Sequence, residues 1–293
     1  MEIGFVGLGK MGGNMVKRLL TLGSHKVVVS DRGAEAVAAS VSAGATGATD
    51  LADLVKKLSA PRTVWVMVPS GGPTQGVIDQ LATLLSPGDL VVDGGNSNFN
   101  DSKRRGAQLK EKGIFFMDAG TSGGIWGLTV GYCLMVGGED EAVERARPVL
   151  DPLAGKIIHC GSAGAGQAAK VCNNMVLAVQ QIAVGEAFVL AEKLGLSAQS
   201  LFDVITGATG NCWAVHTNCP VPGPVPTSPA NNDFQPGFAT ALMNKDLGLA
   251  MDAVNSTGST APLGSHAAEI YAKFAVDHAG LDFSAVIEML RAG

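Results

Sequence analysis

Three polar residues on one predicted helix have types and a spacing suited to acid–base chemistry. Lys170, Asn173 and Asn174 stand at positions i, i+3 and i+4, so a helix brings all three to one face. Burying a charged lysine in a largely apolar helix is costly, and Lys170 is therefore expected to give up its proton more readily than an exposed lysine. The two amides could orient a substrate hydroxyl or carboxylate. A second interpretation stays open, in which Lys170 reaches solvent and both asparagines face water.

A glycine-rich loop near the N-terminus has the spacing of a dinucleotide-binding turn. The segment that we expect to bind the cofactor lies between an apolar strand and a helix and reads Gly7-Leu8-Gly9-Lys10-Met11-Gly12. Gly7 permits the tight turn, Gly9 lets a pyrophosphate approach the backbone, and Gly12 allows helix and strand to pack closely. The phosphates would lie at the helix N-terminus, where free N–H groups favour negative charge. A glycine turn without a ligand has the same spacing.

Asp31 indicates which dinucleotide the loop would bind. It ends the second predicted strand, 19 residues after Gly12, where a carboxylate can accept hydrogen bonds from the adenosine ribose hydroxyls. A carboxylate repels the 2′-phosphate of NADP, which favours NAD. Arg32 follows directly and could offset part of that repulsion, so NADP use is an alternative.

Other candidate ligand-binding residues follow further predicted strands. Ser122, Gly123 and Gly124 come after the strand that ends at Asp118, and a hydroxyl with consecutive glycine N–H groups can hold a carboxylate. An ordinary glycine turn fits the same letters, and the loop over residues 93–98 allows the same two interpretations. Ligands bind at the carboxyl edge of open α/β sheets, so we expect the cofactor to contact three more residues: Val68, Pro69 and Asn96.

The elements that must position these residues alternate in the first half of the chain. Apolar runs predict strands at 2–6, 27–31, 64–68, 90–93, 115–118 and 133–136, with helices at 15–22, 51–58, 77–85 and 101–112. Alternating strands and helices predict a parallel sheet covered on both faces. The second half reads as helices at 164–194, 198–205, 239–253, 263–276 and 284–291, interrupted by a loop over 218–236. We expect an α/β Rossmann dinucleotide-binding domain (1–163), then an all-α domain (164–293), joined by a long interdomain helix.

Composition narrows the class of protein. The 293 residues are 46% hydrophobic and 16% charged, with 39 glycines and a net charge of −5, which describes a compact globular protein. The acidic balance argues against nucleic acid as the main partner but permits a small anionic ligand. Five cysteines without a CxxC pair and five scattered histidines predict reduced thiols and no metal site. We see neither a signal peptide nor an apolar run of about 18 residues, so we expect a cytoplasmic protein with no membrane contact.

Taken together, these motifs resemble the β-hydroxyacid dehydrogenase family over essentially the whole chain. They are GLGxMG at 7–12, SGG at 122–124, GxGxxxKxxNN at 164–174 and Met-Asn-Lys-Asp-Leu at 243–247. The resemblance implies that Lys170 is the general acid/base, that Asn174 orients the substrate together with Asn173, and that Ser122, Gly123 and Gly124 hold its carboxylate. It further implies that Lys245 and Asp246 lie near the cofactor and that Trp213 and Phe234 shape the substrate pocket. A homodimer or homotetramer is expected.

The two halves resemble different subfamilies, which suggests a recombined or engineered chimera. Residues 1 to about 145 look like 6-phosphogluconate dehydrogenase, on Gly-Gly-Asn-Met at 12–15, Asp-Gly-Gly-Asn-Ser-Asn at 93–98 and the SGG segment with Trp126-Gly127. From about residue 145 onward the chain looks like 3-hydroxyisobutyrate dehydrogenase, on residues 166–174, Asn-Cys-Trp at 211–213 and Pro-Ala-Asn-Asn at 229–232.

Three positions in the second half favour a small unphosphorylated substrate. In 6-phosphogluconate dehydrogenases the lysine is followed by His, Asn and Glu at +3, +4 and +7, whereas here the last of these is Leu177. Ala178 replaces a phosphate-contacting tyrosine, and Arg291 is the only arginine after position 151. The resemblance therefore implies NAD-dependent oxidation of 3-hydroxyisobutyrate to methylmalonate semialdehyde, a step of valine degradation. The alternatives are 6-phosphogluconate dehydrogenase and a tartronate- or succinic-semialdehyde reductase. A non-catalytic relative or an imine reductase is disfavoured, because both usually lack the lysine.

Overall fold

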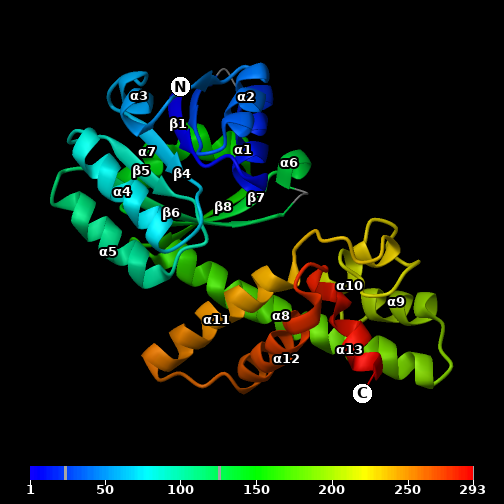
Figure 1. Ribbon diagram of the computed structural model, residues 1–293. Helices are drawn as coiled ribbons and strands as arrows, with labels where there is room; N and C mark the ends of the chain where they lie inside the picture. Colours follow the sequence, from blue (N-terminus) through cyan, green and yellow to red (C-terminus); the bar gives the residue numbers. More distant parts are fainter. Residues whose placement is uncertain (23–24, 125–126, 293) are drawn as a thin grey trace. The chain divides into compact units, whose positions relative to one another are not determined.

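The computed structural model describes residues 1–22, 25–124 and 127–292. Contacts divide the chain into two units, Met1–Lys170 and the residues from Val171 onward, and the division falls inside one long helix. We predicted a domain boundary at residue 163, ahead of this helix, and Lys170 is the last residue of the first unit. The helix, α8 (Ala165–Lys193), is labelled in Figure 1.

The first unit is built on a single eight-stranded sheet with the order β3-β2-β1-β4-β5-β6-β7-β8. Its strands are β1 (Glu2–Val6), β2 (Lys26–Ser30), β3 (Thr46–Gly47), β4 (Thr63–Val66), β5 (Leu90–Asp93), β6 (Phe115–Ser122), β7 (Tyr132–Gly138) and β8 (Ala154–Gly161). Its helices are α1 (Lys10–Leu22), α2 (Ala34–Ser42), α3 (Leu51–Lys56), α4 (Gly72–Leu84), α5 (Phe99–Lys110), α6 (Gly127–Val130) and α7 (Asp140–Leu153).

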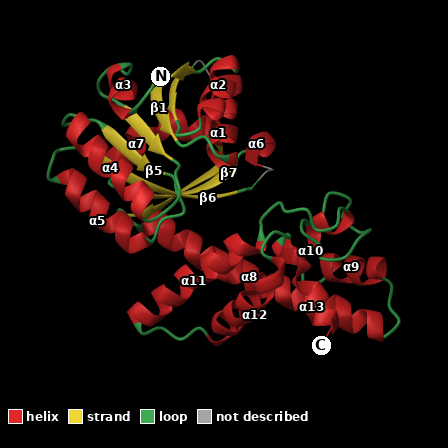
Figure 2. Ribbon diagram, viewed as in Figure 1, coloured by secondary structure: helices red, strands yellow, loops and turns green. Residues whose placement is uncertain are grey.

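Helices cover both faces of this sheet (Figure 2). Successive strand residues alternate between two hydrophobic cores, because side chains of a strand point to opposite faces. Phe5 and Trp65 belong to the core that α1 and α7 cover, whereas Val6 and Val66 belong to the core under α3, α4 and α5. The expected Rossmann-type α/β architecture is confirmed.

One part of the predicted sheet is wrong. We expected all strands to be parallel, but β7 runs antiparallel to β6, and β8 is parallel to β7. The reason is the short connection over residues 123–131, because a parallel crossover needs a dozen or more residues.

The second unit is all-helical, as predicted. It consists of most of α8 (Ala165–Lys193), then α9 (Ala198–Gly207), α10 (Trp213–His216), η1 (Pro229–Asn231), α11 (Thr240–Thr257), α12 (Pro262–His278), η2 (Phe283–Ala285) and α13 (Val286–Ala292). Helices α11 and α12 pack together (Figure 1). Ala178 and Ile182 of α8 belong to one hydrophobic cluster with residues of both helices. By length and composition alone α8 could cross a membrane, and half of its most apolar window is buried within the structure.

Candidate active site

The predicted cofactor residues of the first unit gather at the carboxyl edge of the sheet. β1 lies between β2 and β4, so the chain order reverses at the β1–β4 pair. In open α/β sheets a ligand binds outside the strand ends at such a reversal. The glycine loop follows β1 there, Asp31 follows β2, and Val68 and Pro69 follow β4.

The glycine loop has the geometry that a dinucleotide needs. Gly7 has a left-handed φ of +98°, and a methyl group on it would lie 2.3 Å from the Met67 carbonyl oxygen. A methyl group on Gly12 would lie 2.1 Å from the Gly7 carbonyl oxygen, so both positions are closed to any side chain. Gly9 differs, because it is exposed and a methyl group there would meet nothing within 4 Å. This open space over the backbone fits a pyrophosphate.

The remaining loop residues surround that space. Leu8 is buried in the core, Met11 packs against the same core, and Lys10 is exposed at the start of α1. An exposed lysine beside the open backbone at Gly9 adds positive charge where phosphates would lie.

Asp31 is tied to the glycine loop. One carboxylate oxygen accepts a hydrogen bond from the Leu8 N–H at 2.6 Å, and the other accepts from the Gly33 N–H at 2.7 Å. These bonds hold the half-buried carboxylate at the end of β2, where ribose hydroxyls would meet it. Arg32 is exposed next to it.

The loops after β4 and β5 touch each other beside the glycine loop. A methyl group on Gly95 would lie 3.2 Å from the Val68 carbonyl oxygen. Val68 and Asn96 are half-buried, and Pro69 is exposed. These three predicted cofactor residues therefore line one continuous stretch of the sheet edge.

A buried ion pair that the sequence did not reveal supports the loop after β5. Arg105 and Asp93 are both 0% exposed and their side chains meet at 2.9 Å. The Ser97 hydroxyl donates to the same carboxylate at 2.8 Å, and Arg105 also bonds to Gln75. Burial raises the pKa of Asp93, although Ser97 and Arg105 act to lower it. The only signal in the sequence was an arginine inside a predicted helix, which normally indicates a solvated face.

The predicted carboxylate-binding segment closes β6. Ser122 is its last residue, and Gly123 and Gly124 follow with φ values of +139° and +49°, a conformation that favours glycine. Trp126, part of the resemblance in this segment, lies outside the described residues. All three described residues are half-buried, so their hydroxyl and N–H groups are placed at the sheet edge.

Lys170 packs close to this segment, within the first unit. A methyl group on Gly120, two residues before Ser122, would lie 3.0 Å from Lys170 Cβ and 2.7 Å from the Gly166 carbonyl oxygen. The lysine is half-buried. The structure thus brings together the predicted acid/base and the strand that ends in the predicted carboxylate site.

The second unit holds the remaining predicted residues. Asn174 is 6% exposed, accepts a hydrogen bond from the Asn173 amide at 3.0 Å and donates to the Asp246 carboxylate. The interpretation in which both asparagines face water is therefore wrong for Asn174, and Asn173 alone is exposed. Asp246 is 3% exposed, whereas its neighbour Lys245 is exposed.

Trp213 and Phe234 occupy different environments. Trp213 begins α10 and is 37% exposed. Phe234 packs against both hydrophobic clusters of the second unit, and it follows Asp233 in a pair of left-handed residues with φ values of 52° and 47°. Such backbone strain at residues other than glycine is concentrated at functional sites.

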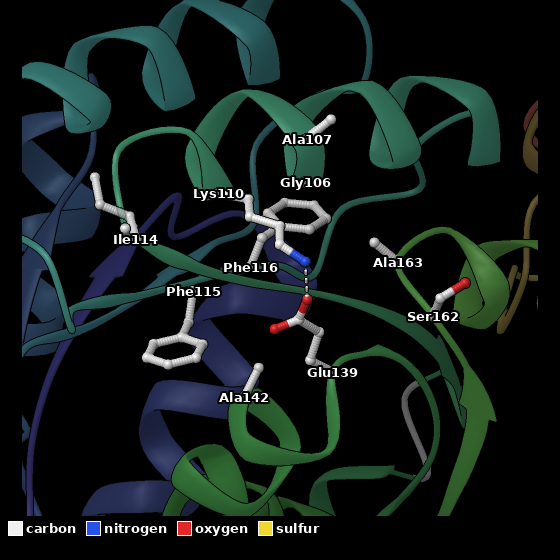
Figure 3. Close-up of a pocket in the computed structure, with 11 residues that line it drawn as sticks. Gly106, Ala107, Lys110, Ile114, Phe115, Phe116, Glu139, Ala142, Ser162 and Ala163 are labelled. Atoms are coloured by element: carbon white, nitrogen blue, oxygen red, sulfur yellow. Dashed lines mark hydrogen bonds and ion pairs between the residues drawn. The ribbon is translucent and has the colours of Figure 1, made fainter.

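A hollow of about 280 Å³ lies away from these residues (Figure 3). It contains Phe115 and Phe116, the first residues of β6, which is the opposite end of that strand from Ser122. An exposed ion pair between Lys110 and Glu139 spans it at 2.6 Å. The hollow contains no predicted site residue.

Two family models divide the chain between them. Residues 2–161 match the NAD binding domain of 6-phosphogluconate dehydrogenase, and residues 164–290 match the NAD-binding domain of NADP-dependent 3-hydroxyisobutyrate dehydrogenase. A Mycobacterium tuberculosis protein named probable 3-hydroxyisobutyrate dehydrogenase is 59% identical over 99% of this chain and 98% of its own length. The NAD-dependent L-serine dehydrogenase of Pseudomonas aeruginosa is 37% identical over 92% of this chain and 91% of its own.

A solved structure agrees along the whole chain. Mycobacterium tuberculosis 3-hydroxyisobutyrate dehydrogenase with L-serine has a TM-score of 0.93 and 58% identity, covering 99% of both chains. The similarity spans both halves at once, so their combination is normal among natural relatives. This corrects the chimera hypothesis: the two resemblances reflect the two domains of one kind of protein.

Proposed function

Because the chain belongs to the β-hydroxyacid dehydrogenase family, we propose that it oxidises the primary alcohol of 3-hydroxyisobutyrate to methylmalonate semialdehyde, with NAD as the preferred oxidant. Membership makes it an NAD(P)-dependent hydroxyacid dehydrogenase. The observation that carries the mechanism is the packing of Lys170 on Gly120, two residues before the Ser122 segment.

The first unit supplies the groups that would hold the dinucleotide. The open backbone at Gly9 and the exposed Lys10 suit the pyrophosphate, and the tethered Asp31 suits the ribose hydroxyls of NAD. Bound there, the nicotinamide supplies the hydride acceptor. The carboxylate at position 31 favours NAD over NADP by repelling a 2′-phosphate, and the exposed Arg32 leaves a smaller NADP activity.

Lys170 acts as the base in this proposal. Its neutral amine accepts the proton of the substrate hydroxyl as the carbon–hydrogen bond gives up its hydride, and the alcohol carbon becomes a carbonyl. The lysine ends the step as an ammonium and returns the proton to solvent or, in the reverse direction, to the carbonyl oxygen. The Ser122 hydroxyl and the N–H groups of Gly123 and Gly124 hold the substrate carboxylate during this transfer. The Asn174 amide orients the hydroxyl.

A small unphosphorylated acid is favoured by what surrounds α8. Ala178 is 0% exposed and Leu177 packs into the same hydrophobic cluster, so neither can donate a proton or bind a phosphate. Arg291 is engaged by Glu192 and Glu288 at 2.5 and 2.6 Å. The second half therefore offers no cation to a phosphosugar at these positions, which argues against 6-phosphogluconate.

L-serine is a second candidate substrate. It has the same primary alcohol and carboxylate, a 37% identical relative is an L-serine dehydrogenase, and a 58% identical structure contains L-serine. The two candidates differ at the central carbon, which carries a methyl group in 3-hydroxyisobutyrate and an ammonium in L-serine. An ammonium needs a hydrogen-bond acceptor that the methyl group does not.

The test is the initial rate of reduced-cofactor formation with NAD and NADP, each offered 3-hydroxyisobutyrate, L-serine and 6-phosphogluconate. We expect the highest kcat/KM for 3-hydroxyisobutyrate with NAD. A higher value for L-serine or 6-phosphogluconate would overturn the substrate assignment. The Lys170→Ala variant should still bind NAD but lose turnover by at least about 100-fold. Near-normal turnover in that variant would overturn the role of the lysine.

A further inference from the structure

Asp118 is a buried carboxylate with no assigned task, and it holds the beginning of α8. It lies on β6 and is 0% exposed. One oxygen accepts a hydrogen bond from the N–H of Gly164, just ahead of α8, and the other accepts from the N–H of Gln167 at 2.8 Å. Both oxygens are thus committed to the first turn of the helix that carries Lys170.

The same turn sits against the sheet with no spare room. A methyl group on Gly166 would lie 2.2 Å from the Met135 carbonyl oxygen and 2.9 Å from Asp118 Oδ2. On β6, a methyl group on Gly120 would lie 2.7 Å from the Gly166 carbonyl oxygen and 3.0 Å from Lys170 Cβ. Because Lys170 lies one helical turn after Gly166, whatever fixes this turn also fixes the place of the lysine backbone.

The turn is also bonded to the loop after β5. The Gln167 side chain donates to the Gly95 carbonyl oxygen at 2.8 Å, and the Gly95 N–H donates to Asp93 at 3.2 Å. Asp93 and Asp118 are register partners on β5 and β6. One buried network thus connects the loop that contains Asn96, predicted to contact the cofactor, with the turn before the predicted base.

Asp118 differs from an ordinary helix cap because it is fully buried, and burying an ionised carboxylate costs free energy. Burial raises the pKa of Asp118 to about 6, even though the N–H groups of Gly164 and Gln167 lower it. A neutral residue would avoid this cost, and strongly perturbed acids are concentrated at functional sites.

We propose that Asp118 is a positioning residue of the dehydrogenase: its carboxylate holds the first turn of α8 against β6 and so aims Lys170 at the substrate that Ser122 binds. The inference rests on the role proposed above for Lys170. Asp118 does not need to touch the substrate or the cofactor for this task.

The first test is Asp118→Asn. An amide can accept from only one of the two backbone N–H groups, and its own NH₂ would oppose the other. We expect kcat to fall about 10- to 100-fold, as for a displacement of the base on the order of 1 Å, with KM for NAD changed less than about twofold. Asp89→Asn is the control, because Asp89 is equally buried and accepts from two backbone N–H groups, that of Arg62 ahead of β4 and that of Ser86 ahead of β5. Its carboxylate also pairs with the Arg62 guanidinium at 3.2 Å. The Asp89→Asn change should leave kcat within about twofold of wild type.

The dependence of kcat on pH distinguishes positioning from mere stability. Among the described residues, the charged or titratable groups that interact with Asp118 are Asp93 on β5, which pairs with Arg105 on α5, and Cys160 on β8. The proposed base Lys170 lies on the helix whose first turn Asp118 holds. Protonation of the proposed base Lys170 lowers kcat on the acidic side in every variant that keeps this lysine. In wild type kcat should fall more steeply below about pH 6, where Asp118 also takes up a proton. This additional loss should be absent from Asp118→Asn and present in Asp89→Asn.

Gly120→Ala is a second variant that should displace Lys170 while leaving the Asp118 carboxylate in place. Its methyl group would press on the Gly166 carbonyl oxygen and on Lys170 Cβ, so kcat should again fall at least about tenfold with NAD binding intact. Normal kcat in folded Asp118→Asn or, where that variant does not fold, in Gly120→Ala would overturn the inference. Were Lys170→Ala inactive in the same series, the proposed function would stand. An active Lys170→Ala would instead remove the proposed base itself.

Discussion

The side-chain amide of Asn174 donates a hydrogen bond to the carboxylate of Asp246, and both side chains are almost fully buried. The bond joins α8 to α11 across 72 residues of sequence. It fixes which way the amide faces, because a carboxylate can only accept from the NH₂ end. The amide oxygen of Asn174 then accepts from Asn173 at 3.0 Å.

This pair predicts strongly coupled effects on turnover of the hydroxy acid. A hydrogen bond to a charged group contributes about 2 kcal/mol, so Asn174→Ala or Asp246→Ala should each lower kcat/KM by roughly 30-fold. The double variant should lose little more than either single one, because each change already breaks the bond. The measurement is a double-mutant cycle on kcat/KM for 3-hydroxyisobutyrate. Losses that simply multiply would show that the two residues act separately.

The glycine loop predicts opposite outcomes for two neighbouring glycines. Gly12→Ala would drive a methyl group against the Gly7 carbonyl oxygen and should destabilise the fold by at least about 2 kcal/mol. Gly9→Ala meets no atom of the chain within 4 Å, so its unfolding should match wild type while KM for NAD rises at least about tenfold. Thermal unfolding and NAD titration of both variants test this. Unaltered NAD affinity in Gly9→Ala would place the pyrophosphate elsewhere.

Local sequence signals were enough for the elements that carry the predicted cofactor and base residues. β1 and β5 match the predicted ranges, because short apolar runs between turn residues are typical of buried parallel strands. Several other elements lie outside the predicted ranges, among them α7 and β8. Helix α7 contains Pro148 and Pro152, which argue against a helix, and most residues of the edge strand β8 are exposed or half-buried. The antiparallel direction of β7 relative to β6 follows from the length of the connection between them and not from the residues of β7 itself.

The supporting network of the site could not be predicted in the same way. Asp118 was recognised only as a strand end, although its partners Gly164 and Gln167 lie 46 and 49 residues further along. Arg105 sits among polar residues of α5, and nothing in that helix indicates that it is fully buried. Long-range contacts of single polar groups leave no periodic pattern, so only the folded chain reveals them.

Asp31 predicts a change of cofactor preference. Asp31→Ser removes the charge that repels a 2′-phosphate and leaves Arg32 beside it, so the ratio of kcat/KM for NAD over NADP should fall at least about tenfold. The lost hydrogen bond to the Leu8 N–H should also weaken NAD. Arg32→Ser is the matched control and should shift the ratio toward NAD. A ratio that stays constant in Asp31→Ser would mean that Asp31 does not meet the ribose.

The raised pKa of Asp118 predicts how the stability of the fold changes with pH. The pKa of Asp118 is raised from 3.8 to about 6 in the folded chain, so between these values the folded state binds a proton that the unfolded state lacks. The ionised Asp118 carboxylate therefore lowers the free energy of unfolding above pH 6. This loss disappears as the pH falls toward 4 and the folded chain takes up the proton. Relative to Asp118→Asn, wild type should gain about 1 kcal/mol of unfolding free energy between pH 7 and pH 5.

Denaturant unfolding of both proteins at the two pH values measures this gain, since effects of all other groups cancel in the difference. If the difference in unfolding free energy between wild type and Asp118→Asn stays constant with pH, burial does not raise the pKa of Asp118. The additional fall of kcat below about pH 6 would then have to come from protonation of a group other than Asp118.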